Sequence, residues 1–136
     1  MIVVDANIIA YLILPGEKHE AVKKAFFRDP DWNVPLLWRS EVRNILSLHV
    51  KKGMLKLGDA HRIMAQAEDL LDGKEYQVPS LHVLQLCEES GCAAYDCEYV
   101  ALARDLESVL LTTDGELLRS FPSRAISLDA YLKSNP

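Results

Sequence analysis

The amino-acid sequence predicts an α/β domain built on a mostly parallel, five-stranded sheet. Short apolar segments alternate along the chain with segments of helical periodicity, the pattern of parallel strands joined by helices. Two apolar segments, 2–4 and 109–111, are continuous rather than alternating, which indicates strands buried on both faces. The 136 residues suit one domain, expected over residues 1–136, with no linker long enough for a second.

The strands are the shorter elements. Pro35 weakens the second one because proline has no N–H for the sheet ladder. Pro79 bounds the third, and Asp114 follows the fourth. The expected strands are 2–4, 33–37, 75–78, 109–112 and 125–128.

The helices are placed by apolar periodicity and by residues that begin or end helices. Pro15 and Gly16 stop the first one. We expect Ser40, Asp59 and Asp96 to open three later helices, since such residues cap helix N-termini. The expected helices are 7–14, 17–28, 40–53, 59–71, 80–91, 96–103, a short one at 117–118 and, at most, the tail 129–136.

Charge is unevenly distributed. The net charge of −5 argues weakly against non-specific nucleic-acid binding, because Lys and Arg supply phosphate contacts. Segment 39–62 nevertheless carries +4, leaving −9 for the rest. Such a basic segment is compatible with a polyanionic substrate, although a solvated pair of helices would look the same.

Cysteine usage and hydropathy bear on the cellular setting. Three cysteines cannot all pair within one chain, and none are spaced as CxxC, which indicates a reduced, cytoplasmic setting. The apolar start has no basic leader or cleavage pattern, and no apolar run approaches a membrane span. We therefore expect no membrane association.

Four acidic residues stand at element junctions. Asp5 and Asp114 follow two strands, while Glu41 and Asp96 begin two helices. In a parallel sheet these positions share one edge. Each acid alone is more simply read as a helix cap or turn residue. Their repetition is not explained in that way, because clustered carboxylates repel unless a cation binds, and oxygen-only ligands suit Mg²⁺ or Mn²⁺.

The residues that carry these acids resemble the four acidic motifs of PIN-domain ribonucleases. The motifs are Asp5-Ala6-Asn7, Ser40-Glu41-Val42, the run from Tyr95-Asp96 to Ala103, and Leu111-Thr112-Thr113-Asp114. The chain is most similar to the small VapC-type toxins of prokaryotic toxin–antitoxin pairs, from residue 1 to about 128. Any one motif is weak, but four in order and at the usual separations are specific. Cys97 departs from the family's usual Ala, and the net charge is more acidic than in many members.

The resemblance implies a three-layer α/β/α fold with strand order 3-2-1-4-5, which makes Asp5 and Asp114 neighbours. It implies that Asp5, Asp96 and Asp114 hold Mg²⁺ or Mn²⁺, directly or through water, and that Glu41 completes the catalytic acids. Asn7 and Thr112 would support the carboxylates or bound water. The implied protein is a homodimeric, metal-dependent ribonuclease that cleaves single-stranded or looped RNA and has a cognate antitoxin.

Other interpretations stay open at this point. Arg39 and Arg43, beside Glu41, would receive substrate phosphate or would simply pair with acids. A PIN domain could also serve as a housekeeping RNA-processing nuclease or as a non-catalytic RNA-binding module. A receiver-type signalling domain is disfavoured because the first strand ends in a single Asp and no Lys follows the late strand. A thiol enzyme lacks a local His, and Gly-rich phosphate loops are absent.

Overall fold

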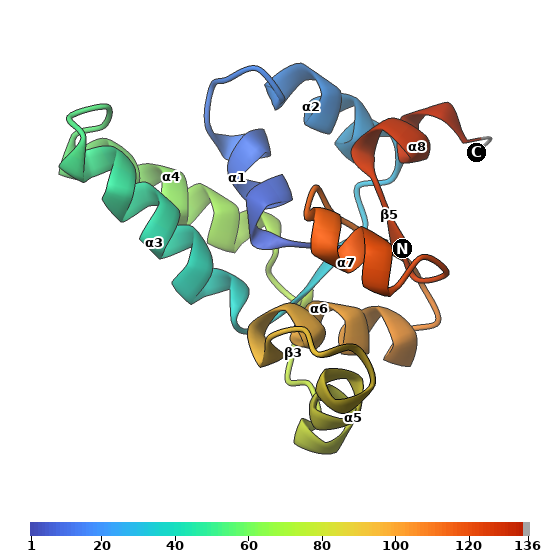
Figure 1. The fold of residues 1–136 in the computed structure, drawn as a ribbon. Coiled ribbons are helices and arrows are strands. Elements are labelled where there is room, and N and C mark those ends of the chain that lie inside the picture. Colours follow the sequence, from blue (N-terminus) through green and yellow to red (C-terminus); the bar gives the residue numbers. More distant parts are fainter. Residues whose placement is uncertain (135–136) are drawn as a thin grey trace.

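Five parallel strands form one sheet between two layers of helices (Figure 1). The fold is described from a computed structural model, which describes residues 1–134. The strand order β3-β2-β1-β4-β5 confirms the predicted three-layer architecture and strand order. The strands are β1 (Ile2–Val4), β2 (Trp32–Pro35), β3 (Glu75–Tyr76), β4 (Leu110–Leu111) and β5 (Ala125–Ile126).

Strand β1 is the centre of the sheet. Val3 is paired with Asn33 of β2 on one side and with Leu110 of β4 on the other. All three residues of β1 are buried, as its uninterrupted apolar sequence predicts. Pro35 does not disturb the sheet, because the pairing of β1 with β2 ends at Asn33, before the missing N–H would be needed.

The helices divide into two layers. Side chains of α1, α2, α3 and α4 pack with Ile2 and Val4 in one core cluster, and α8 packs against it. Side chains of α5, α6 and α7 pack with Val3 and Leu110 in the other. Alternate residues of β1 thus feed opposite cores. The helices are α1 (Ala6–Ile13), α2 (His19–Arg28), α3 (Trp38–Lys51), α4 (Leu57–Leu70), α5 (Ser80–Ser90), α6 (Ala94–Asp105), α7 (Gly115–Ser120) and α8 (Leu128–Lys133).

Three expected helix starts were wrong. Helix α3 begins at Trp38, two residues before Ser40, because the Trp38 ring is buried and its Nε1–H donates to Glu75 at 2.7 Å. Helix α4 begins before Asp59, which lies in its first turn and pairs with Arg62. Helix α6 begins at Ala94, so Asp96 lies in its first turn. None of these three helices has a side-chain hydrogen bond at its N-cap residue.

The end of the chain also differs from expectation. Strand β5 stops at Ile126, and Ser127 caps α8 by accepting a hydrogen bond from the Ala130 N–H at 3.1 Å. The expected helical tail is therefore present as α8, while residues 135–136 lie outside the described residues. Among residues 1–134 no helix has the length and hydropathy needed to cross a membrane.

Candidate active site at the carboxyl edge of the sheet

Asp5 and Asp114 follow the adjacent strands β1 and β4, at the edge where the strand order reverses. Each also caps a helix. The Asp5 carboxylate accepts from the Ile8 N–H at 3.0 Å, and that of Asp114 accepts from Glu116 at 2.9 Å and Leu117 at 3.3 Å. The capping role is therefore real for both residues. It uses backbone donors and leaves their negative charges without an ionic partner.

Thr112 joins these two acids. Its side chain is fully buried, and its hydroxyl donates a hydrogen bond to Asp5 Oδ2. The Thr112 hydroxyl oxygen in turn accepts a hydrogen bond from the Asp114 N–H at 3.0 Å. One hydroxyl just after β4 thus fixes both the Asp5 carboxylate, just after β1, and the backbone that carries Asp114. The sequence predicted a supporting place for Thr112, and its contacts fit that role.

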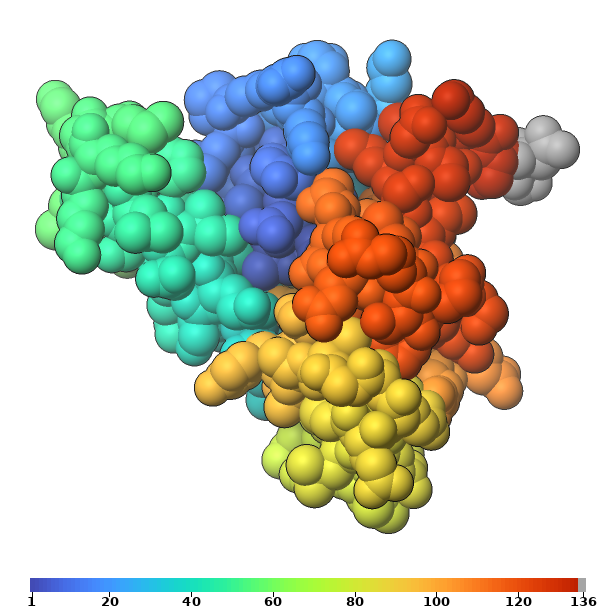
Figure 2. All heavy atoms as spheres, in the orientation of Figure 1, coloured from blue at the N-terminus to red at the C-terminus, as the bar shows by residue number. Residues whose placement is uncertain are grey.

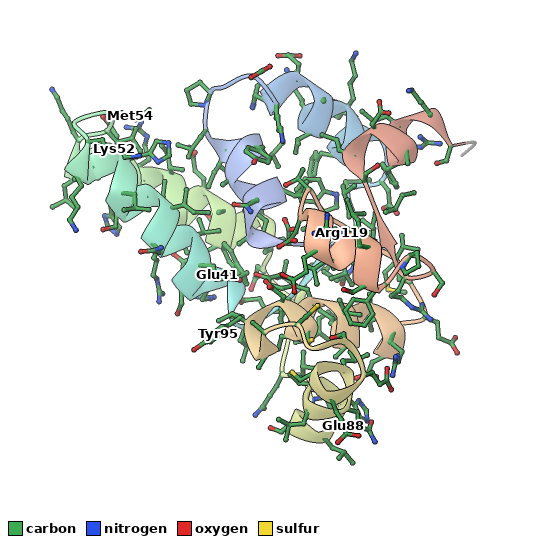
Figure 3. The ribbon with its side chains drawn as sticks, viewed as in Figure 1. Glu41, Lys52, Met54, Glu88, Tyr95 and Arg119 are labelled. Atoms are coloured by element: carbon green, nitrogen blue, oxygen red, sulfur yellow. The ribbon has the colours of Figure 1, made fainter. Side chains whose placement is uncertain are left out.

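Glu41 comes from the other side of the edge, on the first turn of α3. Its carboxylate accepts a hydrogen bond of 2.6 Å from the phenol of Tyr99, which is only 2% exposed. Tyr99 lies one turn after Asp96 on α6. In Figure 3, Glu41 lies at the end of α3 that faces α6 and α7. Sequence reasoning missed Tyr99; the only signal was an aromatic hydroxyl three residues after a candidate site acid.

The pKa shifts of the site acids show that their negative charges repel one another. The pKa of Asp5 is raised to about 6, mainly by burial and also by repulsion from the Asp114 carboxylate. The hydrogen bonds from Thr112 and Ile8 oppose this rise. Burial also raises the pKa of Glu41, with further repulsion from Asp96 and Asp5, while the Tyr99 hydrogen bond opposes the rise. Each carboxylate is held near others that disfavour its charge.

Two further acids border the site. Burial is the main reason that the pKa of Asp96 is raised, and the charges of Asp114 and Glu116 add to it. Glu98, also on α6, repels Glu41. Glu98 and Glu116 were not among the predicted site residues, although each lies two residues after one that was. They deepen the negative potential on this edge.

Arg39 and Arg43, the two arginines nearest to Glu41 in sequence, form no ion pair with the site acids in the described part of the chain. Arg39 pairs with Glu75 at 2.6 Å and with Glu68 at 2.5 Å, so it binds acids outside the site. Arg43 is exposed and lines a groove between α3 and α4. Among residues 1–134, no ion pair includes Asp5, Glu41, Asp96 or Asp114. None of the four acids therefore has an ion-pair partner among residues 1–134.

A match to a family model identifies the protein family of this chain. Residues 2–121 match the family model described as PIN domain, a stretch that contains all four acids. The chain belongs to the PIN domain family. The predicted family resemblance is thereby confirmed.

Individual relatives agree with this assignment. The chain is 30% identical over 125 residues to Ribonuclease VapC3 of Pyrobaculum aerophilum, covering 90% of this chain and 95% of that protein. Its fold is similar to the crystal structure of PAE2754 from the same organism, with a TM-score of 0.76, 25% identity, and coverage of 96% and 92% of the two chains. A toxin–antitoxin complex from Klebsiella pneumoniae has the same fold, with a TM-score of 0.69 and 14% identity over 94% of this chain and 98% of that chain.

The donor set of this PIN domain fits a hydrated divalent metal. Among residues 1–134, no three acid, imidazole or thiol side chains lie close enough to hold one ion together. Mg²⁺ usually keeps several waters and binds through one or two carboxylates, so it does not require a three-residue cluster. The carboxylates also have a physical need for a cation, because burial and mutual repulsion raise the pKa values of Asp5, Glu41 and Asp96.

Two further residues, Asn7 and Cys97, lie close in sequence to the site acids. The exposed Asn7 makes no side-chain hydrogen bond within the described part of the chain, although its backbone amide faces Asp5. The thiol of Cys97, beside Asp96, is buried, and this burial raises its pKa to about 12. A thiol with that pKa is a poor nucleophile, which counts against a thiol enzyme.

Proposed function

We propose that this PIN domain is a divalent-metal-dependent endoribonuclease that hydrolyses single-stranded or looped RNA. The observation that carries the proposal is the set of four acids at one sheet edge, none of which has an ion-pair partner among residues 1–134. In the proposed reaction water attacks the phosphorus and the bond to the 3′-oxygen breaks. The 3′-oxygen takes up a proton, so the products carry a 5′-phosphate and a 3′-hydroxyl.

The proposed roles rest on the family resemblance and on the contacts of the supporting side chains. Asp5, Asp96 and Asp114 would hold Mg²⁺ or Mn²⁺, directly or through water. When bound, the metal would polarise the phosphate and make water a better nucleophile. Thr112 fixes the orientation of the Asp5 carboxylate through its hydrogen bond. Glu41, whose carboxylate accepts the hydrogen bond from Tyr99, would orient water or accept its proton.

The biological role is proposed from the relatives. Similarity to a protein named Ribonuclease VapC3 supports RNA as the substrate. The toxin role and the cognate antitoxin are proposed from the resemblance of the four acidic motifs to VapC-type toxins. We further propose a homodimer in the cytoplasm. The alternatives are a housekeeping RNA-processing nuclease and a non-catalytic RNA-binding module. A gene immediately upstream that encodes a short DNA-binding protein would favour the toxin; its absence would favour housekeeping.

The chemistry is tested with purified protein and single-stranded RNA, with and without EDTA. We expect cleavage that EDTA abolishes and that added Mg²⁺ or Mn²⁺ restores, with 5′-phosphate ends. Asp114→Asn should remove most activity while leaving the fold intact. Cleavage that survives EDTA would contradict the mechanism, and RNA binding without cleavage would favour the binding module.

The toxin role is tested by expressing the protein alone in cells. The wild type should slow growth, and Asp96→Asn should not. Sequencing of RNA 5′ ends after controlled expression would identify the target. If wild type and variant are equally harmless while the purified enzyme cleaves RNA, the housekeeping role is favoured.

A further inference from the structure

A cleft of about 280 Å³ opens beside the acidic site, between α1, the segment that joins α1 to α2, and α3. Asn7 lines its inner end, and the backbone amide of Asn7 faces the Asp5 carboxylate. Tyr11 lies one helical turn further along the same face of α1. In Figure 2 the blue α1–α2 region lies against the green α3 on the visible face. The cleft is thus continuous with the site at Asn7.

The cleft differs chemically from the acids beside it. Its rim carries Lys18, His19 and His49, and Glu17 is the one carboxylate among its lining residues. The Lys18 ammonium lies 5.2 Å from the centroid of the Tyr11 ring. The remaining lining side chains are mainly apolar, at Ala10, Leu14, Pro15 and Ile45. An aromatic ring, apolar walls and a cation favour a flat, partly polar ligand that belongs to a polyanion.

The two histidines are held with one ring nitrogen free. His19 Nδ1 lies 3.0 Å from the carbonyl oxygen of Tyr11, and His49 Nδ1 lies 2.9 Å from that of Ile45. A carbonyl oxygen can only accept, so Nδ1 carries the proton in both rings. Each Nε2 then keeps a lone pair in the neutral imidazole, and no hydrogen bond to either Nε2 occurs within residues 1–134. The cleft therefore offers acceptors as well as a cation.

We propose that this cleft binds one unpaired RNA base next to the scissile phosphate, an inference that rests on the proposed ribonuclease function. Bases present N–H donors to the free imidazole nitrogens and a flat face to the aromatic and apolar walls. Lys18, which lines the cleft, would contact the adjoining phosphate. A site for phosphate alone would need more cations, because phosphate recognition relies on Lys and Arg. The base in this cleft would set the sequence preference of cleavage.

The test measures RNA binding without cleavage, in an Asp114→Asn background with Mg²⁺. The ligands are labelled single-stranded oligomers of A, C, G or U of equal length, and an abasic oligomer with the same backbone. We expect at least one base to bind about tenfold better than the abasic strand, the loss typical of one unstacked base. His49→Ala and Lys18→Ala should remove this preference.

Matched controls lie away from the cleft. His82→Ala changes a histidine on α5 that pairs with Asp105, and Lys23→Ala changes an exposed lysine on α2. Both should keep the wild-type preference. Equal affinity for abasic and base-containing strands would overturn the inference. An unchanged base preference in His49→Ala would also overturn the inference. A peptide of a protein partner would then be the alternative occupant of the cleft. Failure of the proposed function is distinguishable, because then no strand binds and the wild type does not cleave.

Discussion

The phenol of Tyr99 donates a hydrogen bond of 2.6 Å to Glu41, a residue 58 positions earlier in the chain. Tyr99 lies one turn after Asp96 on α6. One helix therefore presents a site acid on its first turn and, on the next, the group that holds a second acid on α3. Because Tyr99 is almost fully buried, the core fixes the position of its hydroxyl. The contact makes Tyr99 a positioning residue that acts through Glu41.

Tyr99→Phe should lower kcat for RNA cleavage about tenfold with little change in KM, since a hydrogen bond to a charged group is worth about 1.5–3 kcal/mol. The ring and its packing remain, so the melting temperature should change little. Steady-state cleavage kinetics and thermal unfolding measure the two effects. Tyr95→Phe is the matched control, because Tyr95 is 66% exposed on the same helix and points away from the core (Figure 3).

A double variant tests the route of the effect. If Tyr99 acts through Glu41, then Tyr99→Phe should have almost no further effect on kcat in a Glu41→Gln background. Additive losses in the double variant would show that Tyr99 acts independently of Glu41. A large drop in melting temperature for Tyr99→Phe alone would assign the residue a structural role.

Asp5→Asn should make the metal-free protein more stable near neutral pH. Burial raises the pKa of Asp5 from 3.8 to about 6 in the folded protein. A group with a raised folded pKa binds its proton more tightly in the folded state, so this carboxyl costs stability as pH rises from about 4 to 6. Asn keeps the helix cap and cannot ionise. The gain should be on the order of 3 kcal/mol at pH 7.5.

The measurement is urea unfolding of wild type and Asp5→Asn in EDTA at pH 7.5 and pH 4.5. The difference between them should shrink at pH 4.5, where Asp5 is protonated in the folded wild type. Other titrating groups are common to both proteins and cancel in the difference. A variant less stable than wild type at both pH values would mean that the Asp5 side chain serves mainly as a cap.

The sheet could be predicted from the sequence because its strands are marked by local patterns. Continuous apolar runs identify β1 and β4, and the acids that follow them identify one functional edge. Helix boundaries were less predictable. The start of α3 depends on burial of the Trp38 ring and its hydrogen bond to Glu75, 37 residues away, which no local pattern records.

The site was predictable where its residues repeat a position relative to the sheet. Asp5 and Asp114 follow strands, so their proximity could be inferred. The partner of Glu41 could not be, because it depends on how α6 packs near α3. Arg39 shows the same limit, since its partners Glu68 and Glu75 lie 29 and 36 residues away and only the fold brings them together.

Arg39 and Arg43 should respond differently to the same substitution. Arg39→Met removes a guanidinium bound by Glu68 and Glu75, and it leaves those acids without their partner, so it should lower the melting temperature. Arg43 is exposed and has no ion pair among residues 1–134, so Arg43→Met should leave stability unchanged and raise KM for RNA by a few fold. Thermal unfolding and cleavage kinetics of both variants measure this. A change in KM that is larger for Arg39→Met would assign phosphate binding to Arg39.

Thr112→Val should weaken both stability and activity, whereas Thr112→Ser should retain both. Valine has the shape of threonine but removes the hydroxyl that donates to Asp5 and accepts from the Asp114 N–H. These groups are buried or partly buried at the sheet edge, so leaving them unpaired should cost about 1–3 kcal/mol in the free energy of unfolding.

Activity separates the two functions of this hydroxyl. With the Asp5 carboxylate held only by backbone N–H donors, kcat for Thr112→Val should fall about tenfold or more even at a temperature where the variant is fully folded, because a misplaced carboxylate disturbs the preorganised site. Circular dichroism establishes the folded fraction before each assay. Full activity in folded Thr112→Val would show that the backbone donors alone hold the Asp5 carboxylate in place. The Thr112 hydroxyl would then contribute only to stability.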